Sequence, residues 1–163
     1  MAHIAILTHT YDAFESRPYL LRDVMRHWVV AGHRISVLEG LENWPDADIA
    51  LMHVDQSLVP AAYARAAARY PVVINGRALD IRKKLVSTQQ LRPSNHWRGP
   101  VIVKTDLNRG GAPEMRYAEL RHKAGLVMDP ALKGIAFSKD PYPILPSMAE
   151  VPQAIWDNPG LVV

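Results

Sequence analysis

The chain has 163 residues, 48% of them hydrophobic, which suits one ordinary domain, or one small domain plus part of another, and makes disorder unlikely on composition. Lys and Arg outnumber Asp and Glu by only 19 to 16 and there is no cysteine, so we expect no nucleic-acid partner, disulfide or thiolate metal site. Because no secretory signal and no apolar run of roughly 20 residues is visible, we expect a cytoplasmic protein with no membrane partner.

The first half of the sequence alternates short apolar runs with helical patterns. Continuous apolar runs predict buried strands, and apolar residues that recur every three or four positions predict helices. In chain order, the predicted elements are a strand at 3–8, a helix between Pro18 and Gly32, strands at 34–38 and 48–53, a helix at 60–70 and a strand at 72–75. This alternation predicts an α/β fold with an open parallel sheet covered on both faces.

The pattern changes after residue 75. The second half predicts a helix at 79–91, a polar loop at 92–98, a strand at 101–104, a helix at 114–123, a strand near 142–145 and a short helix near 153–157. We therefore expect two domains, residues 1–92 and 93–163.

Lys104 ends the apolar run of the 101–104 strand, and Gly110 and Gly111 follow shortly after it. A lysine on a covered strand needs an anionic partner, and glycines allow backbone N–H groups to approach an anion closely. Residues 108–111 could then close over phosphates. The alternatives are a solvated lysine on an edge strand and an ordinary hairpin turn.

Lys83 and Lys84 form a second candidate group. A lysine there could reach the same phosphates from a neighbouring helix, whereas the alternative is a surface helix turn with a local ion pair.

His9, His53 and Asp55 lie just beyond the ends of predicted strands, where open α/β sheets bind ligands. We expect them to contact a substrate or to cap loops. They come from separate loops without metal-ligand spacing, so we predict no metal site.

The order and spacing of Asn75-Gly76, residues 80–84 and residues 99–114 resemble the junction between the leading domain and the first ATP-grasp subdomain of the ATP-grasp superfamily. The resemblance implies a Rossmann-like parallel sheet of the pre-ATP-grasp type, followed by a partial α+β ATP-grasp subdomain. It also implies a carboxylate-amine or carboxylate-thiol ligase that uses ATP.

Carried over to this chain, the resemblance implies that Lys104 contacts the α- and β-phosphates of ATP. Asn108, Arg109, Gly110 and Gly111 would form the phosphate lid, and Lys83 or Lys84 would assist.

Members of that superfamily continue with an adenine-binding hinge and Glu and Asn ligands for magnesium. This sequence ends at residues 160–163, where such a strand would begin, so we expect a truncated chain. We predict a weak or incomplete ATP site and no ligase turnover by this chain alone, with magnesium bound only when the missing part is present. We also expect an exposed apolar edge at 161–163 and, as a hypothesis, self-association into a homo-oligomer.

Two other functions remain open from the sequence. The opening strand, loop and helix, with Gly-His-Arg-Ile-Ser-Val at 32–37, also resemble the N-terminal half of a nucleotide-sugar glycosyltransferase. Such a domain should continue in β-α repeats after residue 75. The third alternative is a non-enzymatic module that binds a ligand or partner at the carboxyl edge of its sheet.

Overall fold

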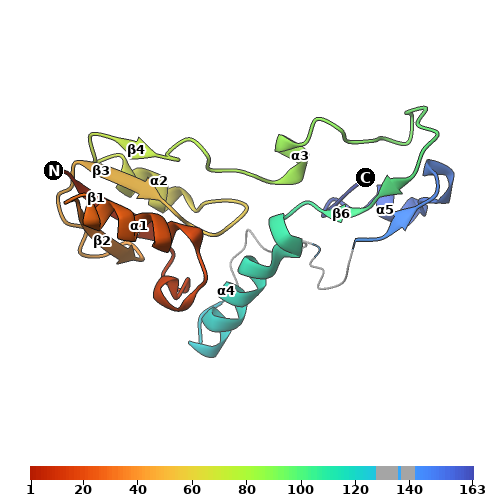
Figure 1. The fold of residues 1–163 in the computed structure, drawn as a ribbon. Coiled ribbons are helices and arrows are strands. Elements are labelled where there is room, and N and C mark those ends of the chain that lie inside the picture. The colour runs from red at the N-terminus through yellow and green to blue at the C-terminus, as the bar shows by residue number, and fades with distance from the viewer. Residues whose placement is uncertain (128–135, 137–141) are drawn as a thin grey trace. The chain divides into compact units, whose positions relative to one another are not determined.

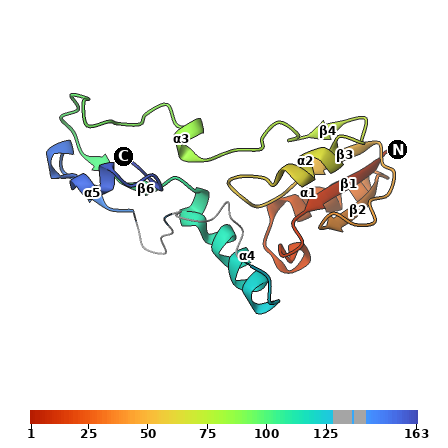
Figure 2. The same cartoon turned by 180° about the vertical axis from the view of Figure 1, so that it is seen from behind.

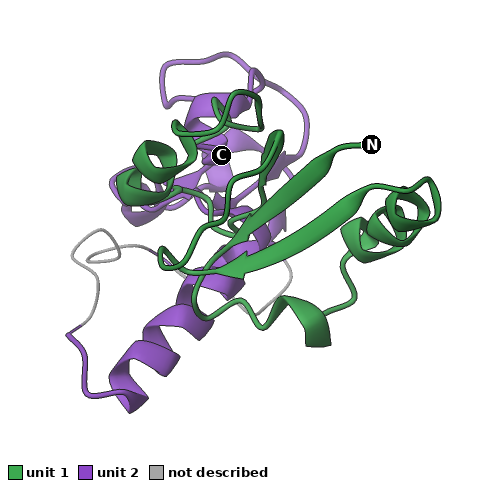
Figure 3. Cartoon of the chain, turned by 90° about the vertical axis from the view of Figure 1, so that its left-hand side faces the viewer, with its two compact units in different colours: residues 1–79 green, residues 80–163 purple. Residues whose placement is uncertain are grey.

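The computed structural model describes residues 1–127, 136 and 142–163. It divides into two compact units, Met1–Leu79 and Asp80–Val163, which Figure 3 colours separately. The division comes earlier than the boundary after residue 92 that the sequence predicted. The reason is that the backbone N–H groups of Lys83 and Lys84 are hydrogen-bonded to Asp106, which ties this segment to the second unit.

The first unit is a four-stranded parallel sheet with the order β2-β1-β3-β4. Its elements are β1 (His3–Thr8), the 3-10 turn η1 (Phe14–Ser16), α1 (Leu20–Val30), β2 (Arg34–Glu39), β3 (Ile49–Met52), α2 (Ala61–Ala67) and β4 (Val73–Ile74). They follow the predicted order, which confirms the α/β class and an open parallel sheet compatible with a Rossmann-like arrangement.

Helices α1 and α2 cover opposite faces of this sheet (Figures 1 and 2). β1 is an inner strand and is buried along its whole length. Ile4 and Ile6 pack on the face that α1 covers, and Ala5 and Leu7 pack on the face that α2 covers. Burial on both faces explains why the strand is a continuous apolar run rather than an alternating one.

Helix α1 packs through Leu21, Met25 and Trp28, which recur at the spacing of one helical face. The helix ends just before Gly32, whose φ of 87° lies in the left-handed region that glycine adopts without strain. The predicted terminator is confirmed.

The described part of the second unit contains two antiparallel pairs of short strands and one longer helix. Its elements are α3 (Lys83–Val86), β5 (Val101–Ile102), β6 (Lys104–Thr105), the 3-10 turn η2 (Asn108–Gly111), α4 (Ala112–Lys123), β7 (Ile144–Leu145), the 3-10 turn η4 (Met148–Glu150), α5 (Gln153–Trp156) and β8 (Leu161–Val162). β5 pairs antiparallel with β7, and β6 pairs antiparallel with β8.

Two predicted elements of this unit differ from the structure. The helix expected at 79–91 is the single turn α3, because Arg82 before it and Ser87 after it have extended backbone. The strand expected at 101–104 is split into β5 and β6 at Val103, whose N–H donates to the carbonyl of Pro143.

Residues 161–163 are half-buried rather than an exposed apolar edge. β8 is paired with β6, and the carbonyl of Val163 accepts a hydrogen bond from the N–H of Leu91 at 2.7 Å. The expected exposed edge is therefore wrong, and self-association stays a prediction. Within the described ranges, the helices are too short or too polar to cross a bilayer.

Candidate functional site

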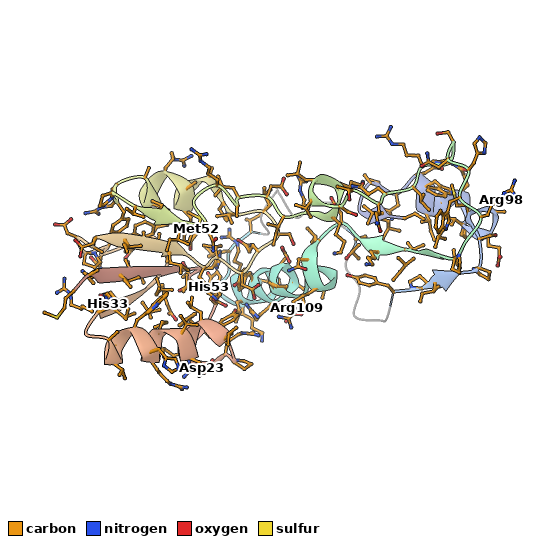
Figure 4. The ribbon with its side chains drawn as sticks, turned by 45° about the horizontal axis from the view of Figure 1, so that its top comes forward. Asp23, His33, Met52, His53, Arg98 and Arg109 are labelled. Carbon is orange, nitrogen blue, oxygen red and sulfur yellow. The ribbon has the colours of Figure 1, made fainter. Side chains whose placement is uncertain are left out.

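The carboxyl end of the parallel sheet gathers a cluster of polar and aromatic side chains. His53 follows β3 and lies at this end, opposite His33 before β2 (Figure 4). The Tyr19 hydroxyl donates to Asp12 Oδ1 at 2.5 Å and lies 3.0 Å from Asp55 Oδ2. Asp12 is fully buried, so the phenol is held between two carboxylates at the place where the sequence predicted ligand contacts.

Burial is the main cause of a raised pKa for Tyr19, and the hydrogen bonds and negative charges of Asp12 and Asp55 act in the same direction. The phenol therefore stays protonated well above the pH at which an exposed tyrosine ionises. It can act here as a hydrogen-bond donor.

His53 packs edge-on against Tyr19 and Phe14, with ring centres 4.6 and 5.3 Å apart. Its Nε2 atom is buried and makes no hydrogen bond with the described part of the chain. Burial lowers the pKa of His53 despite the opposing charges of Asp12 and Asp55. The neutral ring therefore serves as a packing element at neutral pH.

His9 takes a different position from His53 and Asp55. Its ring stacks on Tyr63 of α2 with centres 5.7 Å apart, and its Nδ1 accepts a hydrogen bond from the N–H of Tyr11. The structure thus joins His53 and Asp55 through Tyr19, whereas His9 contacts Tyr63 and the backbone of its own loop.

The second unit brings two lysines to one aromatic ring. Lys83 Nζ lies 5.6 Å and Lys104 Nζ 5.9 Å from the centre of the Tyr142 ring. Lys83 comes from α3 and Lys104 from β6, so two elements separated in the chain each bring an ammonium group to the Tyr142 ring. Both distances fall within the range of cation–π attraction. Lys83 also donates to the carbonyl of Leu107.

The predicted glycine turn adjoins this group. Arg109, Gly110 and Gly111 have φ values of 49°, 67° and 79°, three consecutive left-handed residues that lead into α4. The N–H of Gly110 donates to the Tyr142 hydroxyl at 3.0 Å. Gly110 and Gly111 are buried, whereas Asn108 and Arg109 are exposed.

The surroundings of the Tyr142 hydroxyl are electropositive. Burial acts to raise the pKa of Tyr142, but the hydrogen bond with Thr105, the charge of Lys83 and the N–H of Gly110 outweigh it, so the pKa is lowered. These groups together favour negative charge at this point of the unit.

Lys84 points elsewhere, because its Nζ donates to the carbonyl of Pro159. The local ion pair that the sequence offered as an alternative also forms, between Asp80 Oδ2 and Arg82 Nη2 at 2.6 Å. Of the two candidate lysines on this segment, Lys83 is the one that the structure brings to the Tyr142 ring, which Lys104 also approaches.

Asp106 fixes the segment that carries Lys83. Its Oδ1 accepts the N–H of Lys84 at 2.8 Å, and its carbonyl accepts the N–H of Lys83. We expect Asp106→Ala to lower the free energy of local opening of α3 by about 1 kcal/mol, because a side-chain acceptor that caps a helix N–H contributes about that much. Faster amide exchange at Lys84 would measure this. Asp106→Asn keeps an acceptor and should exchange almost like the wild type, and equal rates in all three proteins would contradict the prediction.

In the part of the chain that the structure describes, no group of three or more His, Asp or Glu side chains is placed to hold a metal ion.

Sequence reasoning missed Asp12, Tyr19 and Tyr142 as site residues. Asp12 lies in the loop that follows β1, and Tyr19 directly precedes α1. This place after the first strand, at the carboxyl end of the sheet, was the available signal. The sequence held no such signal for Tyr142, because its contacts with the lysines join residues that are far apart in the chain. We found no protein family, curated protein or solved structure that matches this chain.

Proposed function

We propose that the 80–163 unit binds a polyphosphate, with ATP as the expected ligand, through Lys104, Lys83 and the turn at Gly110 and Gly111. One observation carries the proposal: two ammonium groups from different elements approach the Tyr142 ring, and a backbone N–H binds its hydroxyl. Ammonium groups and glycine N–H groups are common ligands of phosphate oxygens.

The start of α4 adds to this arrangement. The helix has 12 residues and begins directly after Gly111, so the positive end of its dipole lies at the turn. The basic side chains Arg121, His122 and Lys123 lie at its other end, where they offset the negative end of the dipole. The buried carboxylate of Glu114 lies in the first turn and offsets part of the positive end, so the dipole is a secondary contribution to an anion site at the turn.

We further propose that this site serves an ATP-grasp ligase, in which ATP activates a carboxylate for attack by an amine or thiol. A lysine on a short strand followed by a glycine turn supports this proposal. The antiparallel pairs β5–β7 and β6–β8 also favour it over a glycosyltransferase half, which should continue in parallel β-α repeats.

A ligand-binding module that uses the carboxyl end of the sheet is a second candidate. The Tyr19 hydroxyl between the carboxylates of Asp12 and Asp55 favours it, because this cluster lies where open α/β sheets bind ligands. The polyphosphate proposal places the ligand on the 80–163 unit, whereas the ligand-binding module places it on the 1–79 unit.

Calorimetric titration of the chain with ATP at low ionic strength tests the main proposal. We expect weak, saturable binding that Lys104→Ala reduces by at least about tenfold, because a charge-assisted contact with phosphate contributes roughly 1.5–3 kcal/mol. Tripolyphosphate should compete with ATP, since the lysines and the turn recognise phosphate rather than the base.

Lys123→Ala is the matched control, because it removes the same charge from an exposed position at the far end of α4. It should leave ATP affinity within about twofold of the wild type, as expected for a screened surface charge. Equal weakening by the two substitutions would show non-specific attraction instead of a site. Binding that Tyr19→Phe abolishes and Lys104→Ala spares would favour the module.

A further inference from the structure

Tyr142 occupies the point where the donors of the proposed phosphate site converge. Its hydroxyl accepts the N–H of Gly110 at 3.0 Å and lies 3.4 Å from Thr105 Oγ1. Its ring faces the ammonium groups of Lys83 and Lys104. A phosphate that uses both lysines and the Gly110 N–H has to take the place of this side chain.

We propose that Tyr142 is a built-in competitor of the anion, so that a polyphosphate binds only after the Tyr142 side chain leaves the two lysines and the Gly110 N–H. This inference rests on the proposed polyphosphate site and adds its regulation. The apparent affinity then depends on the fraction of molecules in which Tyr142 is displaced. A ligand that binds only this conformer has its apparent affinity reduced by that fraction.

The chemistry of Tyr142 suits this role. Its ring offers the lysines a negative face, and its hydroxyl offers the Gly110 N–H an acceptor. The same surroundings lower the pKa of Tyr142, which agrees with a point that attracts negative charge. Cation–π contacts and neutral hydrogen bonds are weaker than the charge-assisted hydrogen bonds that phosphate forms. A polyphosphate can therefore replace the phenol, at a loss of affinity.

The backbone next to Tyr142 allows the exchange. Pro143 restricts Tyr142 to extended backbone, and the Pro143 carbonyl accepts the N–H of Val103 at 3.0 Å. The chain is thus held on the carboxyl side of Tyr142, directly before β7. Rotation of the side chain about its own bonds is the movement that the competition requires.

Titration of the full chain with tripolyphosphate tests the proposal in the wild type, Tyr142→Phe and Tyr142→Leu. Phe keeps the ring and frees the Gly110 N–H, so we expect about threefold tighter binding. Leu removes the cation–π contacts as well, and we expect about tenfold tighter binding. Tyr11→Phe, which removes a hydroxyl from the first unit, should leave the affinity unchanged.

Affinity that is unchanged or weaker in both Tyr142 variants would overturn the proposal, because Tyr142 would then be neutral or a ligand contact. Phe preserves the packing, so its result holds even if Leu unfolds the unit. Lys104→Ala separates this inference from the proposed function: binding that is insensitive to Lys104 overturns the polyphosphate site itself. Binding by the Tyr142 variants alone would support the competition, and no binding by any variant would overturn both proposals.

Discussion

Replacing Ile6 with alanine should lower the free energy of unfolding of the 1–79 unit by about 2–5 kcal/mol, the usual range for such a truncation in a core. Ile6 has no exposed surface and lies in the middle of the inner strand β1. It belongs to the cluster formed with Phe14 and Leu51, against which Met25 and Trp28 of α1 pack. Alanine would leave a cavity between the sheet and this helix.

Amide hydrogen exchange measures the effect within the unit, since the most protected amides of β1 and β3 report its unfolding. Val30→Ala is the control, because Val30 lies on the outer side of α1 and is 88% exposed. It should change the free energy of unfolding by no more than about 0.5 kcal/mol. Similar losses from the two substitutions would contradict the arrangement of α1 on the sheet.

The sheet of the first unit could be predicted because its signals are local. The middle of β1, residues 4–7, is a continuous apolar run because both faces of the strand are covered, and the apolar stripe of α1 matches the period of a helix. Gly32 marks the end of that helix by its backbone conformation alone. The alternation of such segments was then sufficient to predict that the sheet of this unit is parallel.

The second unit was harder to predict because its strands have two residues each and pair over long distances in the sequence. Lys104 lies opposite Val162, and no periodicity extends over such short segments. The helix predicted at 79–91 has only one turn in the structure. Its bounds are decided by hydrogen bonds to Asp106, which form only in the folded chain.

The same reasoning applies to the candidate sites. The sequence predicted Lys104 and the glycine turn from their neighbours in the chain, and the structure brings Lys83 to the same tyrosine ring as Lys104. It could not predict Tyr142, because a tyrosine carries no local sign that two lysines will face it. Asp12 and Tyr19 differ from Tyr142, because their place after β1 is a local signal, but the hydrogen bond between their side chains depends on the path of the loop.

Tyr19→Phe should lower the free energy of unfolding of the first unit by roughly 1.5–3 kcal/mol at pH 7, because hydrogen bonds to charged groups contribute that much. The substitution removes the donor that Asp12 and Asp55 share. Chemical denaturation followed by amide exchange in β1 and β3 would measure the loss. Tyr11→Phe should have little effect, which controls for the removal of a hydroxyl elsewhere in the unit.

The pH dependence of the stability lost in Tyr19→Phe tests whether the folded state holds the phenol protonated. The folded state raises the pKa of Tyr19, so above about pH 10 the unfolded chain releases the phenol proton while the folded chain keeps it. The stabilisation from Tyr19 is therefore fully present below pH 10 and declines as the pH rises further. The difference between wild type and Tyr19→Phe should shrink there by up to about 1.4 kcal/mol per pH unit. A constant difference from pH 7 to 11 would mean that burial and the two carboxylates do not hold the phenol protonated in the folded state.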